Sequence, residues 1–176
     1  QCTRIDEILD EVIAPAPNLS DAKASELQLI ALKISEIFID INKGSTLVKK
    51  LINFSSVGGG LQAFPHFRLS DGMSKAAVSF LTKQLAAEHV HTNIDVFAIA
   101  PGATNTGMFQ ASTLNSMSEL EKKDFINKLP KQRLIEPNEI ADLVIFLAAQ
   151  GSTYMHGAII DASMGLGSRP GLISEM

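Results

Sequence analysis

The sequence predicts an α/β fold of strands and flanking helices. Two observations lead to this prediction. Short apolar runs bounded by turn residues are typical of buried strands, and they alternate with longer stretches whose apolar residues recur every three or four positions, as in helices. The chain has 176 residues, of which 45% are hydrophobic, and this suffices for the core of one domain. We therefore expect a single domain over residues 1–176.

The first half of the chain contains one clear helix and one clear strand. Residues 5–13 have apolar positions close to a period of two and run into alternating alanines and prolines, which favours a strand or a short helix. Residues 20–41 carry an apolar stripe at helical spacing, so we expect a long helix there. The apolar run 51–54 is bounded by serines and glycines and predicts a buried strand that ends in a loop.

The second half continues the alternation. The residues after Asp71 have apolar positions at three-and-four spacing and predict a helix. Apolar residues alternate through 92–100 up to a Pro-Gly dipeptide, as in a strand that runs into a turn. Residues 118–128 are typical of a polar helix, residues 133–150 have a proline in a first helical turn and one apolar face, and residues 157–161 are expected to form the last strand.

Composition argues against several classes of partner. The net charge is −4 and the 15 basic residues are spread along the chain, so no basic stripe can follow a phosphate backbone and we expect no nucleic acid. No apolar run approaches the roughly 18 to 20 residues of a membrane span, so we expect no membrane partner. Cys2 is the only cysteine, which argues against an internal disulfide or a cysteine-based metal site. We expect a cytoplasmic protein without a metal.

The segment 51–75 gathers the residues best suited to chemistry. The predicted strand ends at two serines whose side chains point into a crevice, and Lys75 is expected in the first turn of the next helix, facing back toward the strand. Asn53-Phe54-Ser55-Ser56 and Ser74-Lys75-Ala76-Ala77 resemble the active-site segment of the short-chain dehydrogenase/reductase family. That family's pattern is Asn-x-Ser-Ser, a glycine loop, and Tyr-x-x-x-Lys at the start of a long helix.

This resemblance implies a partial Rossmann-like, doubly wound parallel sheet, an NAD or NADP cofactor, and hydride transfer to or from an alcohol or carbonyl substrate. Ser56 would be the catalytic serine that orients the carbonyl, and Lys75 the lysine that holds the nicotinamide ribose. The segment 101–106 resembles the family's Pro-Gly-x-x-x-Thr, although an ordinary strand-to-loop turn would also carry a Pro-Gly. It adds four cofactor-binding candidates: Pro101, Gly102, Thr104 and Thr106.

One departure from the family pattern concerns the proton donor. Where the family keeps its tyrosine, four residues before the lysine, this chain has Asp71. A phenol of pKa ~10 needs only a nearby ammonium to act near neutrality, whereas a carboxyl starts at ~3.9 and Lys75 favours its ionised form. Asp71 therefore stays a candidate by position only. An ion pair between Asp71 and Lys75 is the stronger interpretation.

Three other residues are candidates for the missing roles. His66 follows the glycine loop, and a loop histidine is more often solvated than catalytic. Tyr154 is the only tyrosine, in a segment that the family places away from the chemistry. Gln28 stands near the position at which the family carries an active-site Asn.

A second departure concerns the dinucleotide. No Gly-x-x-x-Gly-x-Gly loop, on which the family's pyrophosphate lies, precedes Ile5. The glycine run 58–60 follows the serine strand and lacks this spacing, so we interpret it as a turn. The sequence also begins at Gln1 rather than Met, and we expect an N-terminal nucleotide-binding portion to be missing from it.

Three functions stay open at this point. The first is the NAD(P)-dependent oxidoreductase that the resemblance implies, and the second is a catalytically silent family member that acts as a binding or subunit-interaction protein. A serine hydrolase built on Ser56 is weaker, because no Gly-x-Ser-x-Gly elbow is present. Helices over 24–41 and 76–88 have the apolar faces with which the family forms dimers and tetramers, so we expect a homo-oligomer.

Overall fold

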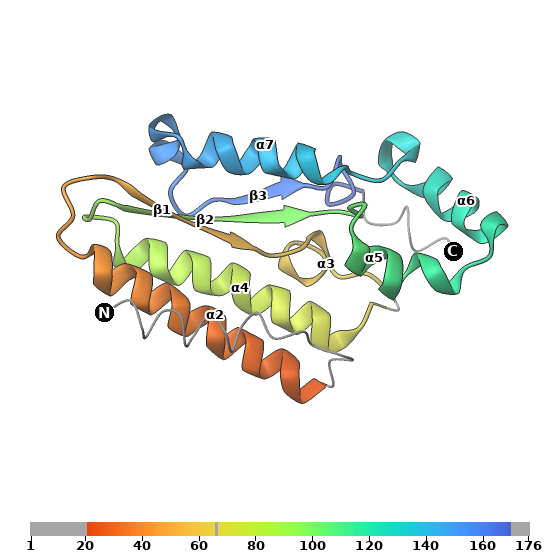
Figure 1. Cartoon of the computed structure of the whole chain (residues 1–176), viewed down its shortest axis with the longest axis horizontal. Coiled ribbons are helices and arrows are strands. Elements are labelled where there is room, and N and C mark those ends of the chain that lie inside the picture. The colour runs from red at the N-terminus through yellow and green to blue at the C-terminus, as the bar shows by residue number, and fades with distance from the viewer. Residues whose placement is uncertain (1–20, 66, 170–176) are drawn as a thin grey trace.

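The computed structural model describes residues 21–65 and 67–169, and within them it shows a three-stranded sheet with helices on both faces (Figure 1). The strands are β1 (Lys49–Phe54), β2 (Ile94–Pro101) and β3 (Ile159–Ala162). They lie in the order β1-β2-β3, and both pairs are parallel. The predicted α/β fold with a parallel sheet is confirmed. The predicted element over residues 5–13 lies outside the described residues.

Long helices cover the two faces of the sheet. On one face, α4 (Leu69–Glu88) packs on β1 and β2, and α2 (Asp21–Asn42) packs against α4. On the other face lies α7 (Pro137–Ala148), followed by the 3-10 helix η3 (Gln150–Met155) (Figure 1). Parallel strands joined by helices in this way are buried on both sides. This arrangement places all three strand ends on one edge, which we call the carboxyl edge.

Strand β2 forms the centre of the core. Its residues 94–100 are all buried. Val96 packs with Leu85 on the α2 and α4 side, whereas Phe97 packs with Leu147 on the α7 side. The period of two in the sequence therefore identified only one face of this strand, since the residues between its apolar positions are buried as well.

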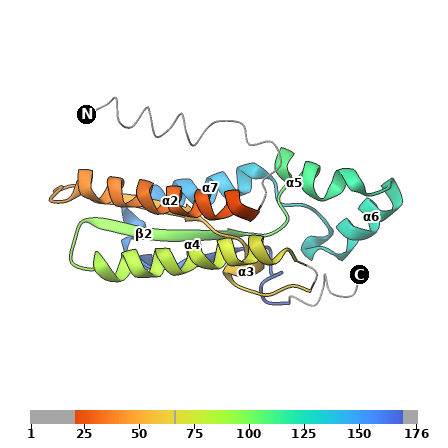
Figure 2. The same cartoon turned by 90° about the horizontal axis from the view of Figure 1, so that it is seen from below.

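The segment between β2 and α7 forms a small subassembly beyond the carboxyl edge (Figures 1 and 2). It comprises α5 (Gly107–Ser112), η1 (Leu114–Ser116), α6 (Glu119–Lys128) and η2 (Pro130–Gln132). Its own apolar cluster is built on three buried residues, Leu114, Phe125 and Leu129. The predicted polar helix is present as α6, and Ser118 and Glu121 form a capping box at its start.

Helix α4 begins earlier than the sequence indicated. Its N-cap is Arg68, whose backbone carbonyl accepts the Gly72 N–H at 3.0 Å. Lys75 is the seventh residue of the helix and lies in its second turn, so the prediction of a first-turn lysine was wrong. The reason is that Arg68 caps the helix through its backbone and makes no side-chain cap bond, which leaves no signal in the sequence.

Within residues 21–65 and 67–169, no helix combines the length and the apolar character needed to cross a membrane.

Candidate functional site

The candidate serine lies where β1 leaves the carboxyl edge. The Ser55 N–H still donates to the Ile99 carbonyl of β2 at 2.8 Å, and the chain then turns into the single helical turn α3 (Val57–Gly60). Ser56 is the N-cap of α3, where its hydroxyl accepts the Gly58 N–H at 3.2 Å. Its side chain is half-buried at the strand end, as the sequence predicted.

Lys75 turns back from α4 toward the same strand end. Its Nζ donates a hydrogen bond to the Phe54 carbonyl at 3.3 Å. Burial lowers the pKa of Lys75 below its ordinary value of 10.5, while the charge of Asp71 acts in the opposite direction. The structure therefore brings Ser56 and Lys75 to one edge of the sheet, beside the same residue of β1.

Asp71 does not join them. It is exposed, and no ion pair with Lys75 occurs among those of the described residues. The expected Asp71–Lys75 ion pair was wrong, because Lys75 turns inward to the Phe54 carbonyl and leaves Asp71 at the solvent side. The backbone carbonyl of Asp71 accepts the Ser74 hydroxyl at 2.8 Å.

The glycine run after Ser56 serves close packing. Gly59 has a positive φ of 80°, and a Cβ there would lie 2.2 Å from the backbone oxygen of Gly72 in α4. A Cβ on Gly60 would lie 2.2 Å from the Ser55 hydroxyl. The interpretation as a turn is therefore confirmed, and glycine is needed at position 59 because α3 touches the backbone of α4 there.

The segment 101–106 lies at the same edge, after β2. Gly102 closely approaches the residue that follows β3, since a Cβ on Gly102 would lie 3.0 Å from the Ser163 Cα. The Thr104 hydroxyl donates to the Gly102 carbonyl at 3.1 Å, and the Thr106 hydroxyl accepts the Phe109 N–H at 3.2 Å as the N-cap of α5. These contacts belong to a strand-to-loop turn, and they place both threonines and Pro101 beside the strand end.

The other candidates lie elsewhere or outside the described residues. Tyr154 belongs to η3 and is 80% exposed. Its neighbour Thr153 bonds to Asp95 at the start of β2, which places this segment at the opposite, amino edge of the sheet, away from Ser56. His66 and the side chain of Gln28 lie outside what the structure describes.

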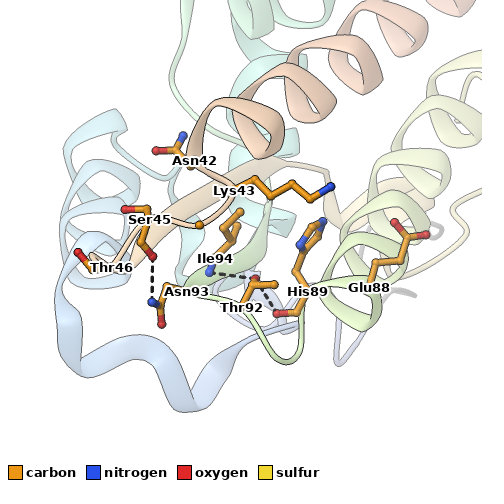
Figure 3. A pocket seen from close by; sticks show the side chains of 10 residues that line it. Asn42, Lys43, Ser45, Thr46, Glu88, His89, Thr92, Asn93 and Ile94 are labelled. Carbon is orange, nitrogen blue, oxygen red and sulfur yellow. Dashed lines mark hydrogen bonds between the residues drawn. The ribbon is translucent and has the colours of Figure 1, made fainter.

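A hollow of about 560 Å³ also lies at the amino edge (Figure 3). It is formed by the ends of α2 and α4 and by the turn before β2, and neither Ser56 nor Lys75 lines it. His89 lines this hollow, and its Nδ1 is buried without a hydrogen-bond partner among the described residues. Because the hollow and the candidate residues lie at opposite edges, we do not assign it to the candidate site.

Sequence reasoning missed Ser55 and Ser79. Both are buried, their hydroxyls lie 2.8 Å apart, and the Ser55 hydroxyl donates to the Lys75 carbonyl at 2.9 Å. The available signal was the second serine of Asn-x-Ser-Ser together with a serine four residues after the lysine. Such spacing places Lys75 and Ser79 on one face of a helix.

Known proteins are similar to this chain in sequence and fold. The family model described as enoyl-(acyl carrier protein) reductase matches residues 40–167. A solved structure of a short chain dehydrogenase family protein from Francisella tularensis matches with a TM-score of 0.70 and 25% sequence identity, over 86% of this chain and 64% of that one. The chain belongs to the short-chain dehydrogenase/reductase family.

Other proteins that match this short-chain dehydrogenase/reductase chain have named activities or ligands. Galactitol 2-dehydrogenase from Rhizobium johnstonii is 30% identical over 162 residues, which are 86% of this chain and 59% of that protein. The 2-keto-3-deoxy-L-fuconate dehydrogenase from Xanthomonas campestris is 35% identical over 109 residues, 61% of this chain and 36% of that protein. The RhlG/NADP active-site complex from Pseudomonas aeruginosa has a TM-score of 0.68 at 25% identity, over 88% and 60% of the two chains.

The chain thus spans between 36% and 64% of the length of these four short-chain dehydrogenase/reductase proteins.

Proposed function

We propose that this chain carries the nicotinamide side of an NAD(P)-dependent oxidoreductase that acts on an alcohol or carbonyl. The observation that carries the proposal is the convergence of Ser56 and Lys75 at the carboxyl end of β1. Ligands of open α/β sheets bind at that edge. Two matched proteins are named as dehydrogenases, and the RhlG complex holds NADP, which supports the same class of reaction.

The residues present fit the nicotinamide half of such a cofactor. An ammonium has three N–H donors, and Lys75 uses one of them on the Phe54 carbonyl, so donors are left for the ribose hydroxyls. The half-buried Ser56 hydroxyl would orient the substrate carbonyl, and the turn from Pro101 to Thr106 would lie beside the nicotinamide. When bound, reduced NAD(P)H would supply the hydride for carbonyl reduction, and oxidised NAD(P)+ would accept it in alcohol oxidation.

A second candidate is a family member that binds the cofactor without turning it over. The observation in its favour is Asp71, which is exposed where the family pattern has its proton donor. A carboxyl stands there in place of the phenol, and among the described residues its side chain makes no ion pair with Lys75. In this case Ser56 and Lys75 would serve binding, with no proton transfer at the site.

Titration of the protein with NADH and NADPH tests the proposal, and we expect binding that depends on Lys75. Lys75→Met removes a charged donor, so the dissociation constant should rise about tenfold or more. Lys83→Met, an exposed lysine further along α4, is the matched control and should bind as the wild type does. Equal affinity of the Lys75→Met and wild-type proteins would contradict the proposal.

Turnover then separates the two candidates. An active oxidoreductase oxidises NADH with a panel of ketones in its wild-type form. The silent protein shows binding only, and Asp71→Tyr is then expected to introduce slow turnover, because it places a phenol four residues before Lys75. Activity in the wild type would exclude the silent candidate.

We also propose that the chain forms a homo-oligomer through α4. Residues spaced along one side of this helix are apolar and exposed, with Leu69 at 77%, Met73 at 62% and Phe80 at 69%. Apolar stripes of this kind mark protein interfaces when they are continuous. Light scattering at micromolar concentration should give at least twice the 18.9 kDa chain mass, and a monomer would contradict the proposal.

A further inference from the structure

A seam of buried and half-buried polar side chains joins the end of β1 to α4 directly below the candidate site. Asn53 lies in β1 and Ser55 directly follows the strand, still paired with β2, so their side chains point the same way as those of residues two apart in a strand. On α4, Thr82 is the partner of Asn53 and Ser79 is the partner of Ser55. Ser55, Ser79 and Thr82 are all buried. Polar groups in such a position are expected to be paired, and here each of them is.

The contact nearest to the site ends on Lys75 itself. The Ser55 hydroxyl donates to the Lys75 carbonyl at 2.9 Å and lies 2.8 Å from the Ser79 hydroxyl. Because a hydroxyl carries one proton, Ser55 uses its proton on the carbonyl and accepts the proton of Ser79. A helical carbonyl has a second lone pair beyond its intrahelical bond, so this contact costs α4 none of its own hydrogen bonds.

Lys75 is therefore held at two points. The Lys75 backbone carbonyl accepts a hydrogen bond from the Ser55 hydroxyl. The Lys75 ammonium donates to the carbonyl of Phe54, the residue before Ser55, at 3.3 Å. Gly60 closes over the serines, since a Cβ there would lie 2.2 Å from the Ser55 hydroxyl and 3.1 Å from that of Ser79. The α3 turn thus leaves no room for the serine pair to move away from the lysine.

We propose that Ser55 and Ser79 are positioning residues that hold Lys75 at the cofactor edge of the sheet. This rests on the proposed function insofar as Lys75 meets the cofactor. Ser55 acts through the backbone carbonyl of Lys75, and Ser79 acts through Ser55.

The same seam supplies a matched control. Asn53 donates to the Thr82 hydroxyl at 3.0 Å, and Thr82 donates to the Val78 carbonyl. This pair joins the same strand to the same helix, with Thr82 buried and Asn53 half-buried, and among the described residues no hydrogen bond connects it to the Lys75 side chain or carbonyl. Thr82→Val keeps the shape of the side chain and removes the hydroxyl, so it weakens the packing of β1 on α4 without releasing the lysine.

The test is the pH dependence with which Lys75 reacts with an acetylating reagent, read by mass spectrometry in the full chain. Only the neutral amine reacts, so the midpoint of the curve follows the protonation of this lysine. In Ser55→Ala and Ser79→Ala, Lys75 is held less firmly, so its ammonium becomes more hydrated. Because hydration favours the charged form, the midpoint of the acetylation curve should move to higher pH. In Thr82→Val the Lys75 curve should overlay that of the wild type, while the melting temperature falls as it does in Ser55→Ala.

Two outcomes would overturn the proposal: a Lys75 curve in Ser55→Ala that overlays the wild type, or an equal shift in Thr82→Val. NADH titration gives a second measurement, in which Ser55→Ala should weaken binding roughly fivefold. A wild-type protein that binds no NADH would count against the proposed function alone, because the acetylation curves still decide whether the serines position Lys75.

Discussion

Replacing Gly59 with alanine is expected to destabilise the protein by about 3 kcal/mol or more. The new Cβ would lie 2.2 Å from the backbone oxygen of Gly72 and 2.4 Å from its Cα. Backbone atoms within a helix cannot turn aside as a flexible side chain can. The positive φ of 80° adds a conformational cost that glycine does not have.

This substitution should also damage the candidate site. The α3 turn follows Ser56 directly and covers the Ser55–Ser79 pair, so moving it away from α4 disturbs both. Urea unfolding measures the stability, and NADH titration measures the site. Gly107→Ala is the control, because a Cβ at Gly107 meets nothing within 4 Å. An equal free energy of unfolding for Gly59→Ala and Gly107→Ala would contradict the close contact between α3 and the backbone of α4.

Replacing Lys50 with methionine is expected to cost about 3 to 5 kcal/mol, because it leaves the carboxylate of Asp95 buried without its cation. The Lys50 ammonium lies 2.6 Å from Asp95, with side-chain exposures of 9% and 7%. It also donates to the hydroxyls of Ser152 and Thr153 at 3.0 and 3.1 Å. These contacts join β1, β2 and η3 at the amino edge.

The double variant Lys50→Met/Asp95→Leu should lose less stability than Lys50→Met alone, since no charge then stays buried. The two hydroxyls keep other acceptors: Ser152 donates to the Leu147 carbonyl and Thr153 to the Gln150 carbonyl. Urea unfolding of the two single variants and the double variant gives the coupling between the charges. Strictly additive losses would contradict a direct ion pair.

Together these predictions assign separate tasks to the two edges of the sheet. The amino edge carries the buried ion pair that joins the strands to η3, far from Ser56. The carboxyl edge carries the candidate chemistry, and its polar contacts converge on Lys75. We therefore expect Lys50→Met to lower stability with little effect on NADH affinity in the folded protein. We expect Lys75→Met to weaken NADH binding with little effect on stability.

Much of the fold was predictable because its signals are local. The spacing of apolar residues identified α2, α4 and α7, and the turn residues identified the ends of β1 and β2. The family resemblance assigned Ser56 and the segment 101–106 to one site, and in the structure both follow strands of the parallel sheet that end on the same side. Family membership was likewise recognisable from short motifs.

Other features depended on contacts between residues far apart in the sequence. Arg68 caps α4 through its backbone, so no residue type in the sequence indicated where this helix begins. That start places Lys75 in the second turn. The inward turn of Lys75 away from Asp71 depends on the position of the Phe54 carbonyl, 21 residues earlier.

By itself, the sequence determined which residues are available to the site: a serine after a strand, a lysine on the next helix and an aspartate in place of the tyrosine. The tertiary structure alone decided which of them meet. It buries Ser55 and Ser79 against the backbone of Lys75 and leaves Asp71 in solvent. The physical reason is that periodicity fixes the face of a helix, whereas the packing of α3 and β1 against α4 selects which side chains on that face lose water.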